Sequence, residues 1–330
     1  MLSATVMLSI GLTPLTTVTR TLLAPVPRTP NVHMAVASKI QGVTFEPATV
    51  QSLSEVSAFF VDAFWLASTT FPGIELNAAD KRQLASKVAD DLGPRYGIQS
   101  ADKRPTMMGG RKGFPSKSLF ESRLIVAREP GGAIIGCAGV EAALYVKVEG
   151  QVLRAEASDQ RIRNELAYMS DEEAEKASEA YSKFGIGGLA TGIIKKQFAN
   201  QLSFPFLEDF TVCSLLANFA VDPAYRRSGL GRALCEQCVV CTTDDWLIDE
   251  MALQVEASNT AAFTLYKKDE YTEVFRNEDA SALRLQPSEP SAFSNLPGPF
   301  SALAPENKNL LKEVASPTVT MSKKVVPMIS

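Results

Sequence analysis

The segment from residue 220 to residue 234 constrains the fold most strongly, because it combines a strand, a tight turn and a helix start. A long apolar run ends at Pro223, and Gly229 and Gly231 precede a helical pattern. The first amides of a helix have no intrahelical partner and carry the positive end of its dipole. Because two glycines let an anion approach these amides, the segment predicts a pyrophosphate-binding turn.

Two other nucleotide-binding motifs do not fit this turn. The sequence contains neither the Gly-x-Gly-x-x-Gly pattern of dinucleotide-binding folds nor the Gly-Lys-Ser/Thr of a P-loop. Arg226, Arg227 and Arg232 add positive charge around the turn.

The remaining hydrophobic patterns predict a mixed α/β fold. Helices are expected at 53–65, 78–92, 170–185, 230–241 and 259–268. Strands are expected at 43–45, 122–128, 133–140, 212–221, 251–255 and 271–275. Ser170 and Glu173 have the spacing of a capping box at the start of one of these helices.

The chain divides into a core, two insertions and two terminal segments. One domain is expected over residues 39–286, with insertions near 68–118 and 145–210. Residues 287–330 are rich in proline and serine and show little periodicity, which predicts a disordered C-terminal tail.

The composition of residues 1–38 resembles that of an organellar transit peptide, because the first acidic residue of the chain is Glu46. A plastid destination is expected, with the mitochondrion as the alternative and an untargeted tail as a third interpretation. Pro14, Arg20 and Pro25 interrupt the apolar runs, so this stretch predicts no transmembrane helix.

The composition excludes several classes of function. A net charge of −4 argues against a general nucleic-acid binder. The single histidine, His33, lies in the predicted transit peptide, which disfavours Ser-His-Asp hydrolases, Cys-His proteases and histidine metal sites. Cys235, Cys238 and Cys241 have no fourth ligand nearby, so half-buried apolar positions on a helix are favoured over a metal site.

The turn carries a family resemblance that continues along the chain. Arg226-x-x-Gly229-x-Gly231 resembles the Arg/Gln-x-x-Gly-x-Gly/Ala signature of the GNAT acetyltransferase superfamily. Val221-x-Pro223 before it and residues 255–266 after it match the family in the same order, as in plastid-type and N-terminal or lysine acetyltransferases. The resemblance implies a mixed central sheet flanked by helices, with a splayed cleft between the family's fourth and fifth strands.

The resemblance also implies which residues bind acetyl-coenzyme A. The backbone of Phe219, Ala220 and Val221 would pair with pantetheine, and Asn259 would contact it. The pyrophosphate would be held by the loop residues Arg226, Arg227, Ser228, Gly229, Leu230, Gly231 and Arg232. Tyr266 would lie near the thioester sulfur and donate a proton to the leaving thiolate. No metal is implied.

The chain departs from the family pattern at two positions. Gln254 stands where related N-terminal acetyltransferases often carry glutamate, so the general base stays open between Glu256, Glu208, Asp209 and a water chain. Glu270 stands where the family usually has glycine before an aromatic residue, which predicts a changed or mildly strained turn costing about 1 kcal/mol.

These observations predict an N-acetyltransferase that moves acetyl from acetyl-coenzyme A directly to a primary amine. The acceptor could be a protein N-terminus, a lysine side chain or a small amine, and the two insertions are expected to shape its site. Neither nucleic acid nor a membrane is an expected partner, and the oligomeric state is not predicted. A non-catalytic acetyl-coenzyme A sensor is the main alternative, and a hydrolase or other acyltransferase on the same fold is a weaker one.

Overall fold

The computed structural model describes residues 41–67, 75–98, 114, 118–195, 209–285 and 310–326. The predicted transit peptide and Glu208 lie outside these ranges, as does much of the predicted insertion at 68–118.

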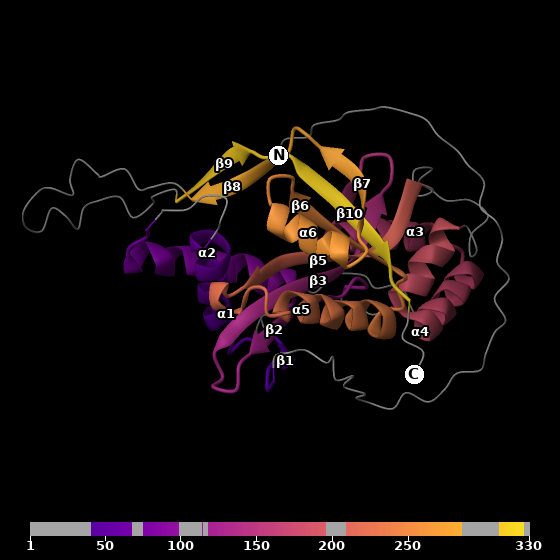
Figure 1. Ribbon diagram of the computed structural model, residues 1–330. Helices are drawn as coiled ribbons and strands as arrows, with labels where there is room; N and C mark the ends of the chain where they lie inside the picture. Colours follow the sequence, from indigo (N-terminus) through magenta and orange to yellow (C-terminus); the bar gives the residue numbers. More distant parts are fainter. Residues whose placement is uncertain are drawn as a thin grey trace, which may run out of the picture.

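An eight-stranded sheet forms the centre of the molecule, in the order β1-β2-β3-β5-β6-β10-β7 with β4 added to β3 (Figure 1). Its strands are β1 (Thr44–Pro47), β2 (Ser122–Arg128), β3 (Ile134–Val146), β4 (Gln151–Leu153), β5 (Phe210–Val221), β6 (Glu250–Glu256), β7 (Thr272–Asn277) and β10 (Thr318–Lys324). The β5–β6 pair is parallel and the other pairs are antiparallel. The predicted mixed α/β class is therefore confirmed.

Helices cover both faces of this sheet. They are α1 (Leu53–Phe60) with its π-helical continuation η1 (Val61–Leu66), α2 (Ala78–Arg95), α3 (Ala155–Tyr168), α4 (Asp171–Ile194), α5 (Leu230–Val240) with η5 (Cys241–Asp245), and α6 (Thr260–Lys268). Side chains alternate across a strand, so Cys137 of β3 packs with α1 and α2 while Ala138 packs with α5. None of the helices in the described ranges has the length and apolar character needed to cross a bilayer.

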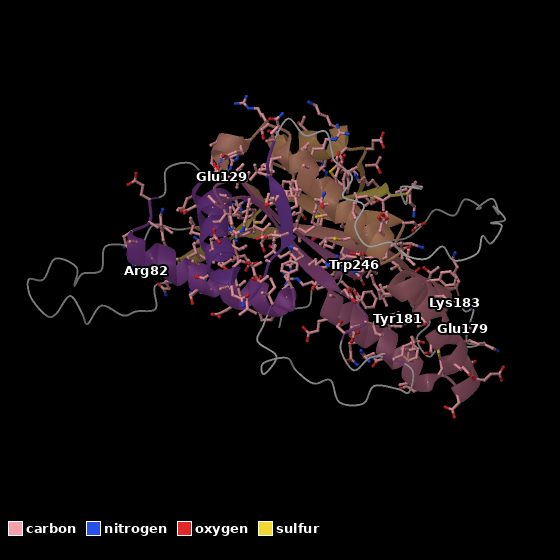
Figure 2. All side chains as sticks on the ribbon, turned by 90° about the horizontal axis from the view of Figure 1, so that it is seen from below. Arg82, Glu129, Glu179, Tyr181, Lys183 and Trp246 are labelled. Carbon is pink, nitrogen blue, oxygen red and sulfur yellow. The ribbon has the colours of Figure 1, made fainter. Side chains whose placement is uncertain are left out.

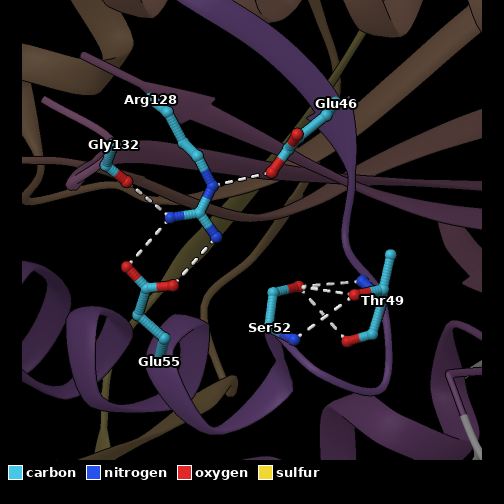
Figure 3. A network of polar contacts seen from close by, with 6 residues as sticks. All are labelled: Glu46, Thr49, Ser52, Glu55, Arg128 and Gly132. Carbon is cyan, nitrogen blue, oxygen red and sulfur yellow. Dashed lines mark hydrogen bonds and ion pairs between the residues drawn. The ribbon is translucent and has the colours of Figure 1, made fainter. Parts of the chain in front are cut away.

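Arg128 fastens α1 to the first strands of the sheet (Figure 3). Its guanidinium donates to Glu46 of β1 at 2.6 Å and to both oxygens of Glu55 of α1 at 2.9 and 2.8 Å. It also donates to the carbonyl of Gly132 in the β2–β3 turn at 2.7 Å. The hydrogen bonds to the two carboxylates raise the pKa of Arg128, so this connection stays charged.

The prediction of a disordered tail is wrong for the part of it that the structure describes. β8 (Ser281–Leu285) and β9 (Leu311–Ala315) form a two-stranded sheet, and β10 then inserts between β6 and β7. Val319 and Met321 of β10 are completely buried. The domain therefore continues past residue 286, because the alternating apolar positions of β10 supply a strand that the sheet requires.

The second predicted insertion, 145–210, contains β4, α3 and α4. The capping box is confirmed: the Ser170 hydroxyl accepts from the amide of Glu173 at 3.3 Å, and the Glu173 carboxylate accepts from the amide of Ser170 at 2.8 Å. Lys183 pairs with Glu179 at 2.6 Å on the outer side of α4 (Figure 2). The predicted end at Gly185 is a kink instead, with φ of 60°, because the residues after it resume the helix and are largely buried.

The turn after α6 adopts the conformation for which glycine is usual. Glu270 has φ of 66°, and the amide of Tyr271 donates to the carbonyl of Tyr266 at 3.0 Å. The chain therefore keeps the turn and accepts a left-handed residue with a Cβ atom.

We expect Glu270→Gly to raise the free energy of unfolding by about 1 kcal/mol, because glycine removes the left-handed penalty. Urea unfolding followed by circular dichroism measures this change. Glu270→Ala is the control, since it removes the carboxylate but keeps the Cβ atom. An equal gain from both variants would mean that charge, not backbone strain, sets the stability of the turn.

Candidate functional site

The strands β5 and β6 are paired over only part of their length and then diverge in the middle of the sheet. Their parallel pairing ends where Leu216 lies opposite Leu253, and residues 217–221 continue beside β3 only. Residues 212–216 are buried, whereas residues 217–219 are half-exposed. The register shift in the β3–β5 pairing and the positive φ of Asn218, 47°, mark the bulge at which β5 turns away. The expected splay is confirmed, and we call this divergence the strand fork.

The loop between β5 and α5 lies beside the strand fork and contains backbone amides that are not used within the loop. The Asp222 carboxylate accepts from the amide of Ala224 at 2.8 Å, and the Ser228 hydroxyl donates to the carbonyl of Tyr225 at 2.6 Å. Arg227 and Gly229 both have positive φ, of 63° and 97°. Within the described part of the chain, the amides of Arg227, Gly229, Gly231 and Arg232 have no acceptor. Backbone amides without an acceptor at a helix start can bind an anion.

The two glycines of this loop have different roles. A Cβ atom on Gly229 would meet nothing within 4 Å, so this position requires glycine for its φ and leaves space above the amides. A Cβ atom on Gly231 would lie 3.4 Å from atoms of both Phe219 and Leu265. Gly231 therefore lets α5 pack closely on β5 and α6, whereas the sequence predicted that it admits the anion.

The side chains of the three arginines in the loop make different contacts. Arg226 donates to the carbonyls of Ala67 and Ala63 at 3.1 Å each, where the α1–η1 helix ends. Its guanidinium is thus held by carbonyls at the end of this helix, and its contact with an anion stays a prediction. Arg232 is 71% exposed and pairs with Glu236 at 3.2 Å. Arg227 is exposed, has no partner among the described residues, and remains the best placed to meet an anion.

Tyr225 anchors the loop from below, a role that sequence reasoning missed. Its hydroxyl donates to the carboxylate of Glu129 in the β2–β3 turn, and this hydrogen bond raises the pKa of Tyr225. Because the two residues lie far apart in the sequence, no local pattern could have paired them.

Tyr266 of α6 lies beside the strand fork, as the resemblance implies. Its ring meets that of Phe219 edge-on, with centroids 6.3 Å apart. Burial raises the pKa of Tyr266 well above its ordinary value, so the hydroxyl keeps its proton throughout the physiological pH range. At the start of the same helix, the Asn259 side-chain oxygen caps α6 by accepting from the amide of Ala262 at 3.1 Å. The Asn259 side-chain nitrogen has no partner among the described residues.

Two of the three candidate carboxylate bases, Glu256 and Asp209, lie within the described residues. Arg284 donates to both oxygens of Glu256, at 2.9 Å in one case, and Ser316 donates to the same carboxylate at 3.1 Å. Glu256 therefore ties the β8–β9 sheet to the end of β6, which makes it a poor acceptor for a substrate proton. Asp209 is exposed at the start of β5, and Glu208 lies outside the described residues.

The three cysteines on one helix face are buried and free. Burial raises the pKa of Cys235 to about 12, which disfavours the thiolate that a metal requires. They are more deeply buried than the half-buried positions predicted. Across the described ranges, no group of three histidine, cysteine or acidic side chains is arranged to hold a metal ion.

The sequence also gave no sign of a polar pair on the opposite face of the strand fork. The side-chain nitrogen of Asn218 donates to the Tyr96 hydroxyl at 2.8 Å. Tyr96 follows the last turn of α2 and is 5% exposed. The two residues are far apart in the chain and belong to no motif, so only the fold brings them together.

Residues 201–270 match the family described as the acetyltransferase (GNAT) family. Over 60 residues the chain is 47% identical to [ribosomal protein bS18]-alanine N-acetyltransferase of Escherichia coli strain K12, which covers 16% of this chain and 34% of that protein. The chain thus spans about a third of the length of the curated relatives that it matches. The matched segment includes the strand fork and the amide loop, so these two features lie in the part of the chain that is similar to the GNAT acetyltransferase family.

Solved structures of acetyltransferases can be superposed on the chain, with low scores. A GNAT acetyltransferase from Streptococcus pneumoniae has a TM-score of 0.36 at 13% identity, over 86% of this chain and 99% of that one. Arabidopsis thaliana NAA60 in complex with acetyl-CoA has a TM-score of 0.39 at 13% identity, over 86% and 98%. The fold assignment therefore depends on the strand order and the strand fork, not on these superpositions.

Proposed function

We propose that this chain is an N-acetyltransferase that moves acetyl from acetyl-coenzyme A to a primary amine. The observation that carries the proposal is the adjacency of the strand fork, the free amides of the α5 loop and the buried Tyr266. These three features provide an edge for pantetheine, a site for pyrophosphate and a proton donor for sulfur.

In this reaction the neutral amine nitrogen attacks the thioester carbonyl carbon, and the carbon–sulfur bond then breaks. The acetyl group ends on nitrogen, the thiolate takes a proton from Tyr266, and the nitrogen releases one proton to a base or to water. Backbone amides of residues 217–221 that face away from β3 can stabilise the oxyanion that forms between these steps. Binding both reactants at one fork supplies a further part of the acceleration.

Among acceptors, we favour a protein N-terminus. The bS18 relative is named for an alanine of a protein substrate. We also infer import into a plastid, or alternatively a mitochondrion, from the composition of residues 1–38. A fluorescent fusion of those residues tests the destination.

The deciding experiment measures coenzyme A release by the purified chain with acetyl-coenzyme A and a panel of N-terminal peptides, lysine peptides and small amines. Release together with an acetylated product of one class supports the enzyme. Tight binding of acetyl-coenzyme A without release against any acceptor would favour the sensor, and release without an acetylated product would indicate a hydrolase.

We expect Tyr266→Phe to lower kcat about a hundredfold or more, because the leaving thiolate loses its proton donor. The Kd for acetyl-coenzyme A should change less than twofold, since the ring stays in place. Tyr271→Phe is the matched control: this neighbouring ring lies 5.7 Å from Tyr266, and its buried hydroxyl has no hydrogen-bond partner among the described residues. Equal turnover in the wild type and Tyr266→Phe would remove the tyrosine from the mechanism.

A further inference from the structure

The Tyr96 hydroxyl packs against β3 and β5 at the level where the strand fork begins. A Cβ atom on Gly139 of β3 would collide with this hydroxyl, so glycine is required for the side chain to reach the strand. Gly139 lies opposite Ala217, the first residue of β5 beyond the pairing with β6. Tyr96 therefore lies over β3 and β5 at the level where β5 leaves β6, although it belongs to a distant helix end.

Two contacts fix the orientation of this hydroxyl. Asn218 donates to it at 2.8 Å, from a backbone that the bulge holds at a positive φ of 47°. The guanidinium of Arg95 lies 5.6 Å from the centroid of the Tyr96 ring, and Arg95 is itself paired with the buried carboxylate of Glu141. Within the described residues, the Tyr96 hydroxyl makes no other hydrogen bond. One oxygen lone pair thus accepts from Asn218, and the other has no donor among the described residues, in a side chain that is 5% exposed.

The two fork tyrosines lie on opposite faces of the sheet. Tyr266 packs in the hydrophobic cluster that contains α5, whereas Tyr96 packs in the cluster formed by α1 and α2. In acetyl transfer, the attacking nitrogen and the leaving sulfur occupy different corners of the tetrahedral intermediate. A hydroxyl that serves sulfur and one that serves nitrogen must therefore approach the reacting carbon from different sides.

We propose that the Tyr96 hydroxyl binds the acceptor amine, accepting a hydrogen bond from its N–H, and that Asn218 is the residue that positions Tyr96. The inference rests on the proposed acetyl transfer and assigns its amine side. The attacking nitrogen uses its lone pair on the thioester carbon, so only its N–H groups can bond to the protein, and the free lone pair of Tyr96 is a suitable acceptor. Asn218 acts through Tyr96 and does not touch the amine.

The test compares Tyr96→Phe, Asn218→Gly and the double variant with the wild type in the full chain. Asn218→Gly keeps a backbone that tolerates positive φ and removes only the side-chain donor. Tyr181→Phe is the matched control, because it deletes a half-buried tyrosine hydroxyl on α4. The measured quantities are kcat/KM for the best amine acceptor and the Kd for acetyl-coenzyme A by isothermal titration calorimetry.

We expect Tyr96→Phe to lower kcat/KM for the amine by about ten- to a hundredfold, the effect of one hydrogen bond to a nitrogen that becomes charged. Asn218→Gly should lower it by about fivefold or more, and the double variant should be no worse than Tyr96→Phe, because both changes act through one hydroxyl. The Kd for acetyl-coenzyme A should stay within twofold in every variant.

Two results would overturn the inference while leaving the proposed function intact: full amine turnover in Tyr96→Phe, or a parallel loss of acetyl-coenzyme A binding. Additive losses in the double variant would remove Asn218 as the positioning residue. Absence of transfer by the wild type to any amine would overturn the proposed function itself and this inference with it.

Discussion

Replacing Gly229 with valine is expected to raise the Kd for acetyl-coenzyme A about a hundredfold, or about 2.7 kcal/mol. Gly229 has φ of 97°, a conformation that a β-branched residue avoids. The loop must then move to a negative φ and turn away the amides at the start of α5. Two charge-assisted hydrogen bonds to pyrophosphate, each of about 1.5 kcal/mol, account for the loss. Calorimetric titration with acetyl-coenzyme A measures it.

Gly132→Val is the matched control for this change. Gly132 also has a positive φ, 87°, and a Cβ atom there would also meet nothing within 4 Å. It lies in the β2–β3 turn and supplies no amide to the α5 loop, so its variant should lose similar stability but change the affinity much less than Gly229→Val does. Unchanged binding by Gly229→Val would show that the α5 loop does not hold the pyrophosphate.

The second large effect concerns the last strand of the sheet. We expect Met321→Ala to lower the free energy of unfolding by about 3 kcal/mol, because Met321 is completely buried and its removal leaves a cavity between β6 and β7. Urea unfolding monitored by tryptophan fluorescence measures the change.

Val326→Ala provides the comparison for that measurement, because Val326 follows the same strand but is 70% exposed. Its substitution should change stability by less than about 0.5 kcal/mol. If Met321→Ala lowers the free energy of unfolding by a similarly small amount, residues 318–324 do not form a buried strand and belong to the unstructured tail that composition alone suggests.

The parts of the fold that the sequence predicts well are those with local signals. The β2–β3 hairpin has a Pro-Gly-Gly turn between apolar runs, and the helix after Ser170 has its capping box, so both follow from neighbouring residues. The amide loop is predicted for the same reason, since the strand end, the two glycines and the helix start lie together. The family resemblance adds the splay of β5 from β6, which no local pattern encodes.

Apart from the helix end predicted at Gly185, the failures concern long-range contacts. The strand β10 follows a Pro- and Ser-rich stretch, and its partners β6 and β7 occur well before it in the chain. Glu256 looks like a free base until the fold places Arg284 against it. Arg226 matches a motif position, yet its side chain donates hydrogen bonds to carbonyls at the end of the α1–η1 helix. Tyr96 meets Asn218 only in three dimensions, where α2 ends over the strand fork.

The insertion of β10 between two earlier strands also sets an order of events for folding. β7 pairs with β10 and β10 pairs with β6, so β7 has no place in the sheet until the later strand has arrived. During synthesis, the edges of β6 and β7 that later pair with β10 therefore remain unpaired. Their free N–H and C=O groups can pair with strands of other chains. Such distant pairing closes slowly, because a long segment must lose its freedom before any contact is gained. The period between the emergence of β7 and the docking of β10 is when this chain most needs protection from aggregation.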